Sequence, residues 1–289
     1  MTPGLYLPAG SAGADGDPVA VTPEIAGWRF TGLRVVDLEP GGSRTVATGA
    51  DEVLVLPLEG GCEIEMDGAH FTLAGRRSVF DGVSDFAYLP IGAGARLSSP
   101  GGGTIALPSA RADRRHEPAY VPAAAVPIEV RGAGRATRQL TNFFAPEVGR
   151  AQRLVAVEVL TPAGNVSSWP PHKHDTTTPG GEAELEEIYY FRFDAPHAFG
   201  FHRTYAADFD VAVPVRDGDV FLVPRGYHGP CVALPGYPMY YLNVLAGPGP
   251  ERSLAFSDDP AHAWVRPSWE AETRDPRVPM TTAAGRRAL

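Results

Sequence analysis

The sequence predicts an all-β protein made of two similar β-barrel or β-sandwich domains with few short helices. Its 289 residues are enough for two domains of ordinary size. The chain contains 33 glycines and 29 prolines, and short apolar runs recur between turns rich in these residues. Such spacing is typical of sandwiches and barrels rather than of alternating strands and helices. No sustained helical apolar stripe appears, so we expect helices to be minor.

The expected strands follow one another along the chain. In the first half they are Leu33–Leu38, Glu52–Leu58, Cys62–Met66, His70–Leu73 and Gly103–Leu107. After the Pro- and Ala-rich stretch Pro118–Pro127 the pattern resumes with Ile128–Val130, Arg153–Leu160, Glu187–Phe193, Gly200–Tyr205, Asp210–Pro214, Val220–Val223 and Tyr240–Ala246.

Two pairs of similar segments indicate an internal duplication. The first half contains DEVLVLPLEGG and later YLPIG, and the second half contains EEIYYFRF and later LVPRG. Glu52 lies 38 positions before Pro90, and Glu187 lies 37 positions before Pro224. The offset between the two pairs is nearly constant, and this favours two copies of one domain.

Composition excludes several classes of partner. The formal net charge is −9 and no run of lysine or arginine stands out, which argues against nucleic acid or an anionic membrane surface. The two cysteines do not make a disulfide framework. No apolar run approaches a membrane span, and the first residues lack a signal-peptide pattern. We therefore expect a cytoplasmic protein.

The segment from Ser167 to His228 carries a metal-ligand pattern. His172 and His174 are two residues apart, so in a strand both imidazoles point to one face. Glu187 opens the next apolar strand, and a Gly- and Pro-bounded turn presents His228. Three imidazoles and a carboxylate suit a first-row divalent metal, with positions left for water or substrate. The sequence leaves the metal open among zinc, manganese, iron, nickel and cobalt.

This order of residues resembles the cupin superfamily, whose first motif supplies two histidines and a glutamate and whose second supplies a histidine. The segment TTTPGGEAELE lengthens the gap between His174 and Glu187, and the turn before His228 is one residue shorter than usual. Glu186 is therefore an alternative ligand. We prefer Glu187 because in cupins the ligand usually stands directly before the β-branched strand residue, here Ile188.

The first copy lacks these ligands, because no His-x-His precedes Glu52 and Gly94 stands where His228 would fall. The predicted organisation has four segments: a flexible N-terminal arm at 1–20, a degenerate N-terminal cupin domain without metal ligands at 21–140, a metal-binding C-terminal cupin domain at 141–250 and a C-terminal extension at 251–289.

A narrower resemblance covers about Ser167 to Pro248, through SSWPPHKHDT, ELEEIYYFRF, VRDGDVFLVPRGYH and PGYPMYYLNVLAGP. These segments resemble the 5-deoxy-glucuronate isomerases of inositol catabolism, in a group that also holds 4-deoxy-threo-hexulose-uronate isomerases. The resemblance implies a bicupin of two jelly-roll domains with one divalent metal. It also implies conversion of 5-deoxy-D-glucuronate, a small sugar acid, to 5-dehydro-2-deoxy-D-gluconate.

That reaction needs a base and an acid near the metal. The candidates are Glu186, Tyr190, Tyr241 and a metal-bound hydroxide. If the strand that begins at Glu187 is regular, Tyr189 rather than Tyr190 shares the face of Glu187. We therefore name Glu186, Tyr189 and Tyr241 as candidate catalytic residues.

The substrate carboxylate needs a cation, and arginine offers a bidentate fork. Arg203 and Arg225 are the preferred candidates, with Arg192 behind them. Lys173 points away from the two histidines in a regular strand, so it is a weaker candidate.

Two other functions remain open, namely a different metal-cupin enzyme such as a dioxygenase and a non-enzymatic sugar-binding bicupin. A homo-oligomer is the default expectation for the assembly.

Overall fold

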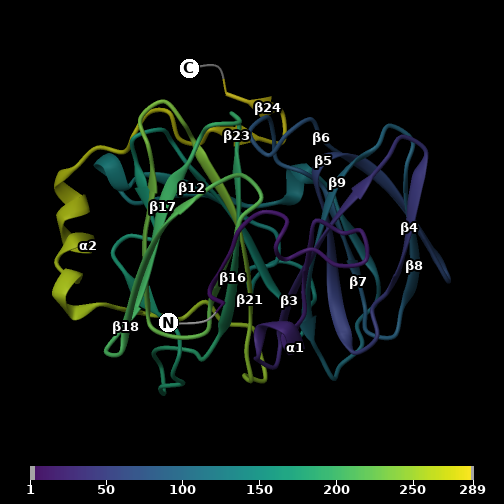
Figure 1. Cartoon of the computed structure of the whole chain (residues 1–289), viewed down its shortest axis with the longest axis horizontal. Coiled ribbons are helices and arrows are strands. Elements are labelled where there is room, and N and C mark those ends of the chain that lie inside the picture. Colours follow the sequence, from purple (N-terminus) through teal and green to yellow (C-terminus); the bar gives the residue numbers. More distant parts are fainter. Residues whose placement is uncertain (1–3, 288–289) are drawn as a thin grey trace.

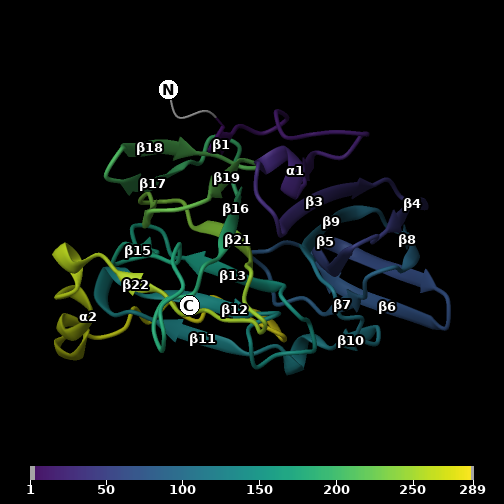
Figure 2. The same cartoon turned by 90° about the horizontal axis from the view of Figure 1, so that it is seen from below.

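The computed structural model describes residues 4–287 and forms two β-sheet domains that lie side by side (Figures 1 and 2). Strands make up 47% of the structure and helices about 7%, which confirms the all-β class. The two α-helices are single turns, α1 (Pro23–Ala26) and α2 (Val265–Ser268). In the part of the chain that the structure describes, no helix has the length and apolar character needed to cross a membrane.

The first domain is one nine-stranded curled sheet whose main path runs β10-β7-β5-β9-β3-β2. Strands β4, β6 and β8 extend it through β5 and β8 and curl it around an apolar core. Its strands are β2 (Val19–Val21), β3 (Thr31–Leu38), β4 (Gly42–Ala47), β5 (Asp51–Met66), β6 (Ala69–Arg76), β7 (Phe86–Leu89), β8 (Gly94–Ser99), β9 (Gly103–Arg111) and β10 (Ala119–Val121).

The second domain has two sheets that enclose a second apolar core. The seven-stranded sheet has the order β1 (Tyr6–Leu7), β19 (Val220–Val223), β16 (Glu186–Phe193), β21 (Met239–Ala246), β13 (Val155–Thr161), β12 (Arg138–Asn142) and β11 (Ile128–Arg131). The six-stranded sheet contains β18 (Phe209–Val215), β17 (Gly200–Ala206), β20 (Tyr227–Ala233), β15 (His172–Lys173) and β22 (Ser257–Asp258), with β14 (Val166–Ser167) paired to β20.

Each strand expected from the sequence lies on an observed strand, with one difference in connectivity. The runs Glu52–Leu58 and Cys62–Met66 belong to the single 16-residue strand β5. The strand continues through Gly60 and Gly61, and its register against β6 shifts at that point. A side chain at Gly61 would place its Cβ 2.6 Å from the carbonyl oxygen of Leu73, so only glycine fits there.

The two domains repeat one arrangement of central strands. The order β7-β5-β9-β3 in the first domain matches β19-β16-β21-β13 in the second. Val53 pairs with Leu89, and Glu187 pairs with Val223, so equivalent residues are 134 positions apart. This register corrects the sequence comparison by one residue: Glu52 is equivalent to Glu186, and the counterpart of Glu187 is Val53.

The equivalent glutamates Glu52 and Glu186 make reciprocal contacts between the domains, which we call the glutamate clasp. Glu186, at the start of β16, accepts hydrogen bonds of 2.7–2.9 Å from the backbone N–H groups that lead into β3, those of Arg29, Phe30 and Thr31. Glu52, near the start of β5, accepts bonds of 2.7–2.8 Å from the groups that lead into β13, those of Gln152, Arg153 and Leu154.

A buried ion pair also crosses between the domains. The Arg76 guanidinium from β6 donates to the Glu158 carboxylate on β13, and the side chains of both residues are at most 3% exposed. Tyr240 donates to the same carboxylate at 2.8 Å. Removing one partner of such a pair leaves a buried charge uncompensated, so we expect it to fix the mutual orientation of the domains.

Two features differ from the predicted segment boundaries. Strands β11 and β12 pair with β13, so they belong to the second sheet and not to a first domain ending at 140. We propose the boundary in the connection 122–127. In the described part of the expected arm, residues 4–20, β1 pairs with β19 and Tyr6 donates to Asp219 at 2.6 Å. Residues 1–3 of that arm lie outside the described residues.

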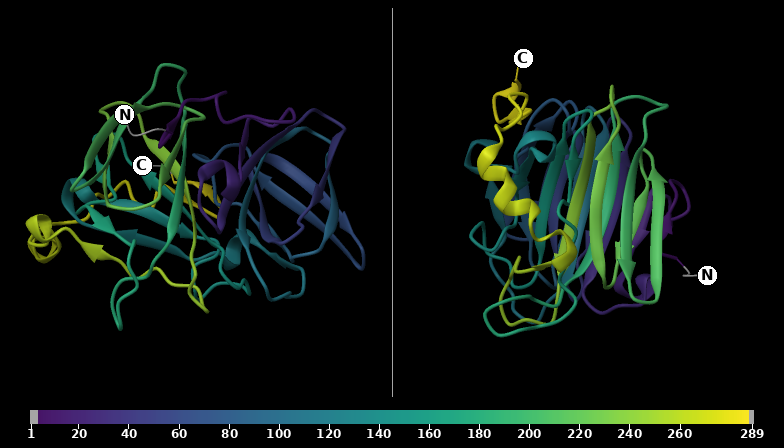
Figure 3. Two further views of the ribbon diagram at one scale, coloured as in Figure 1. Left: turned by 60° about the horizontal axis from the view of Figure 1, so that its bottom comes forward. Right: turned by 90° about the vertical axis from the view of Figure 1, so that its left-hand side faces the viewer.

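The C-terminal extension runs along one side of the second domain (Figure 3). It begins with β22, which pairs with β15, and continues through α2 to the short hairpin of β23 (Thr281–Thr282) and β24 (Gly285–Arg286). The extension therefore lies beside the segment that carries His172 and His174.

We predict that Glu52→Ala destabilises the protein by about 3 kcal/mol or more. Three backbone donors would lose a fully buried carboxylate, and each unpaired buried donor costs about 1–3 kcal/mol. Glu65→Ala is the matched control on the same strand, since Glu65 is about half exposed and meets only Arg96 at 3.5 Å. Urea unfolding of both variants checks this, and equal stability losses would contradict a structural role for the clasp.

Candidate metal centre

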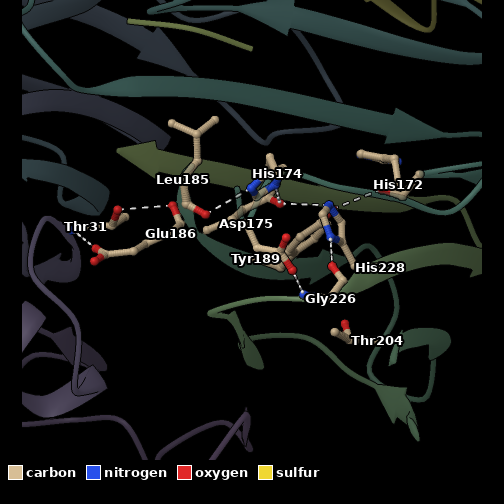
Figure 4. Close-up of polar contacts among 12 residues, drawn as sticks. Thr31, His172, His174, Asp175, Leu185, Glu186, Tyr189, Thr204, Gly226 and His228 are labelled. Carbon is tan, nitrogen blue, oxygen red and sulfur yellow. Dashed lines mark hydrogen bonds and ion pairs between the residues drawn. The ribbon is translucent and has the colours of Figure 1, made fainter. Parts of the chain in front are cut away.

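Three buried side chains converge inside the second domain, between its two sheets (Figure 4). His174 follows β15, Glu187 lies on β16 and His228 lies on β20. The Nε2 atoms of His174 and His228 lie 2.9 and 3.1 Å from Glu187 Oε2. Candidate ligand atoms of all three residues lie within 4.8 Å of one another. The structure thus brings together three of the four residues that the sequence pattern selected.

His172, the fourth predicted ligand, lies beside this cluster but is not part of the group within 4.8 Å. Its backbone pairs with that of His228, and the two ring centroids are 4.5 Å apart. The ring centroid of Phe256 lies 4.8 Å from that of His172. The role of His172 as a ligand therefore stays a prediction.

All three histidines direct the same ring nitrogen toward the backbone. The Nδ1 atoms lie 3.0–3.4 Å from the carbonyl oxygens of Pro170 for His172, Leu185 for His174 and Gly226 for His228. A carbonyl only accepts, so each Nδ1 carries a proton, and Nε2 is the ring atom that can bind a metal when the imidazole is neutral. Such carbonyl contacts fix the tautomer and orientation that a metal ligand needs.

The donor set fits a divalent transition metal. His228 is fully buried, and its Nε2 makes no hydrogen bond within the described residues. Burial opposes ionisation of Glu187, but His228 and His174 outweigh it and hold the pKa of this carboxyl well below its usual range. Burial lowers the pKa of His172, which keeps its imidazole neutral. Neutral imidazoles and an ionised carboxylate are the forms that bind zinc, manganese, iron, nickel or cobalt.

The segment between His174 and Glu187, which lengthens the first motif, supports the ligands. Glu182 from this segment is buried and accepts hydrogen bonds from Lys173 Nζ and from the backbone N–H of Asp175. Asp175 accepts from Lys173 Nζ at 2.6 Å and from the Gly226 N–H at 2.8 Å. Asp175 therefore ties the His172–His174 segment to the turn before His228.

The cluster borders a cavity whose wall includes both predicted tyrosines. Tyr189 shares the face of Glu187, as the strand alternation predicts, whereas Tyr190 packs in the core on the other face of the sheet. The hydroxyls of Tyr189 and Tyr241 each lie 3.1 Å from Ser168 Oγ. Burial raises the pKa of both phenols, so both stay protonated at neutral pH.

Glu186, a candidate catalytic residue, lies outside the group of His174, Glu187 and His228. Its carboxylate points away from the histidines, toward Thr31 (Figure 4), because residues 186 and 187 face opposite sides of β16. The backbone donors of the clasp occupy both of its oxygens.

The two predicted substrate-binding arginines are also outside the cavity. Arg203 forms a bidentate pair with Asp210, and Arg225 forms one with Asp208, all four side chains being well exposed. Strand β17 and the β19–β20 turn direct these two arginines to the surface.

The cavity wall contains polar residues that the sequence reasoning missed: Arg131, Arg138, Asn142 and Asn243. The first three come from β11 and β12, before the metal motifs. Only Asn243 had a usable signal, because it alternates with Tyr241 in the run 240–246.

We predict that Asp175→Asn lowers metal affinity by about 10- to 100-fold, the usual effect of losing a residue that orients ligands. The amide loses the charge that binds Lys173 and weakens the link to Gly226. Competition with a fluorescent chelator measures the affinity, with Asp210→Asn on the exposed face of β18 as control. Unchanged affinity in the Asp175 variant would contradict the role of this link.

Known proteins resemble this chain over most of its length. The family model described as the KduI/IolB family matches residues 5–265. A 5-deoxy-glucuronate isomerase of Geobacillus kaustophilus is 37% identical over 268 residues, which cover 91% of this chain and 96% of the relative. The isomerase of the same name from Bacillus subtilis strain 168 is 32% identical, over 85% of this chain and 91% of the relative.

Solved structures give the same picture of the fold. An IolB-like protein from Salmonella typhimurium LT2 superimposes with a TM-score of 0.85 at 33% identity, covering 91% of this chain and 99% of that one. A Bacillus subtilis oxalate decarboxylase, a cupin-fold protein, superimposes with a TM-score of 0.62 at 11% identity, covering 95% and 88%, which supports the bicupin fold alone. The chain belongs to the KduI/IolB family.

Proposed function

We propose that this chain is a metal-dependent isomerase that converts 5-deoxy-D-glucuronate to 5-dehydro-2-deoxy-D-gluconate in inositol catabolism. Relatives named 5-deoxy-glucuronate isomerase match it over most of both chains. The observation that carries the proposal is the buried cluster of His174, Glu187 and His228 at the wall of a cavity. We keep His172, whose ring contacts that of His228, as the proposed fourth ligand.

The reaction moves a carbonyl group from C1 to C2 of the sugar. A proton leaves C2 and one is added to C1, while the hydroxyl proton of O2 is exchanged for one on O1. Negative charge therefore develops on two neighbouring oxygens. A divalent cation held by the histidine Nε2 atoms and Glu187 would supply Lewis-acid stabilisation of that charge.

The chain itself contributes protonated hydroxyls at the same wall. Because burial raises the pKa of Tyr189 and Tyr241, these phenols are donors to substrate oxygens rather than bases. Ser168 links them, so a proton can pass from one phenol to the other through its hydroxyl. In this proposal the pair holds the sugar hydroxyls and returns protons, and the group that removes the C2 proton is left unassigned.

The identity of the metal, a cytoplasmic location and a homo-oligomeric state belong to this proposal as predictions. A 4-deoxy-threo-hexulose-uronate substrate is the nearest alternative, and comparing kcat/KM for the two uronates separates them. A purely sugar-binding bicupin would bind the uronate without turnover.

We predict that the purified protein forms the ketose from 5-deoxy-glucuronate, and that a chelator stops the reaction until a divalent metal is restored. Glu187→Gln should lower kcat by about 10²-fold or more, the scale of losing one charge-stabilising group. His197→Ala, at an exposed histidine, should not change it. Carbon NMR of the product and metal analysis of each variant provide the measurements. Turnover that survives both the chelator and Glu187→Gln would exclude a metal-dependent reaction.

A further inference from the structure

We propose that Arg138 binds the carboxylate of the substrate at the end of the cavity opposite the metal centre. The inference rests on the proposed function, since it assigns the residue that selects an acidic sugar over a neutral one. It replaces Arg203 and Arg225, which are paired at the surface.

Arg138 is a buried cation without an anion among residues 4–287. The residue is only 5% exposed, and its one hydrogen bond to the protein runs from Nη1 to the carbonyl oxygen of Ala136 at 3.1 Å. Arg76, which is equally buried, instead has the carboxylate of Glu158. A buried charge without a partner is destabilising, so a guanidinium kept in this state is suited to an anion that comes from outside.

The guanidinium is held still and remains charged. Its carbon lies 5.6 Å from the centre of the Trp269 ring, which comes from the C-terminal extension. A Cβ at Gly132 would lie 2.8 Å from Nη1, so the backbone passes directly beside the group. Burial lowers the pKa of Arg138 to about 10, which leaves it cationic at neutral pH. A fixed planar fork of donors matches a carboxylate in bidentate geometry.

The neighbouring Arg131 does not offer the same function. It pairs with Arg138 across β11 and β12 and also lines the cavity. Its Nε and Nη2, however, donate to the two carboxylate oxygens of Glu129 at 2.8 Å. Of the two arginines in the cavity wall, Arg138 is therefore the one whose charge is not neutralised by the protein.

Strand register places Arg138 and the metal centre at opposite ends of one wall. Glu187 and Tyr189 are successive inward residues of β16, and Asn142 lies in the same cross-strand row as Tyr189. The next row contains Tyr241 and Leu140, and Arg138 lies one inward step beyond it. Three steps of roughly 6.6 Å separate the backbones of Glu187 and Arg138 along the strands, and their long side chains line one cavity between these positions.

Asn243 supplies independent evidence that a polar ligand lies between these ends. It shares the row of Tyr189 and Asn142, lines the cavity and is 7% exposed. Its Nδ2 is buried and has no hydrogen-bond partner within the described part of the chain. A buried donor left unpaired is costly, and a hydroxyl in the middle of the sugar chain would satisfy it.

The test compares two substrates in Arg138→Met, which removes the charge and keeps most of the length. We expect KM for 5-deoxy-glucuronate to rise at least about 30-fold, with kcat changed only a few-fold, because loss of one partner of a buried ion pair is expensive. For 5-deoxy-glucose, which has a primary alcohol instead of the carboxylate, kcat/KM should match that of the wild type. Arg203→Met, at an exposed arginine, should leave both substrates unaffected.

An equal fall in kcat/KM for both substrates would overturn the proposal, and so would an unchanged KM for the uronate. Arg138→Lys is the second variant if the methionine protein does not fold, and its expected result is a smaller rise in KM confined to the uronate. Calorimetric binding of D-glucuronate separates this inference from the proposed function. Binding that depends on Arg138, in a protein that does not isomerise 5-deoxy-glucuronate, would refute the function and leave the carboxylate site standing.

Discussion

The arrangement of the second domain depends on the hydrogen bonds that hold the Glu186 carboxylate to the first domain. Three backbone donors before β3 fix this side chain on the outer face of β16. Strand alternation then directs Glu187 and Tyr189 into the cavity. The equivalent contact of Glu52 fixes the start of β13 in the same way. The duplication therefore supplies two equivalent sets of hydrogen bonds between the domains. One of them holds the start of β16, the strand that carries Glu187.

The same duplication explains why only one domain carries a site. At the shared offset, Val53 occupies the position of Glu187 and Gly94 that of His228. A valine there can only extend the apolar core of the first domain, where it is buried. The carboxylate that both halves retain is the one in the clasp. The first domain thus keeps the residues that join the halves and has none of the ligands.

Much of this was readable from the sequence, because strand alternation and ligand spacing are local properties. They predicted most strands, the placement of Tyr189 and the convergence of His174, Glu187 and His228. Contacts between distant segments were not readable in this way. Nothing near Glu186 in sequence indicates that its partners are Arg29–Thr31, and nothing near Arg138 indicates that β12 lines the cavity beside the candidate metal centre. The sequence also favoured Arg203, which is exposed and paired with Asp210, because the burial that leaves a cation without a partner is visible only in the folded structure.

Anomalous X-ray scattering from crystals of the metal-loaded protein tests the central claim most directly. One strong peak should lie within bonding distance of His174 Nε2, His228 Nε2 and a carboxylate oxygen of Glu187, about 2.0–2.2 Å for zinc. A peak elsewhere, or no peak at this cluster in a protein that contains stoichiometric metal, would contradict the assignment of the metal centre and the chemistry built on it.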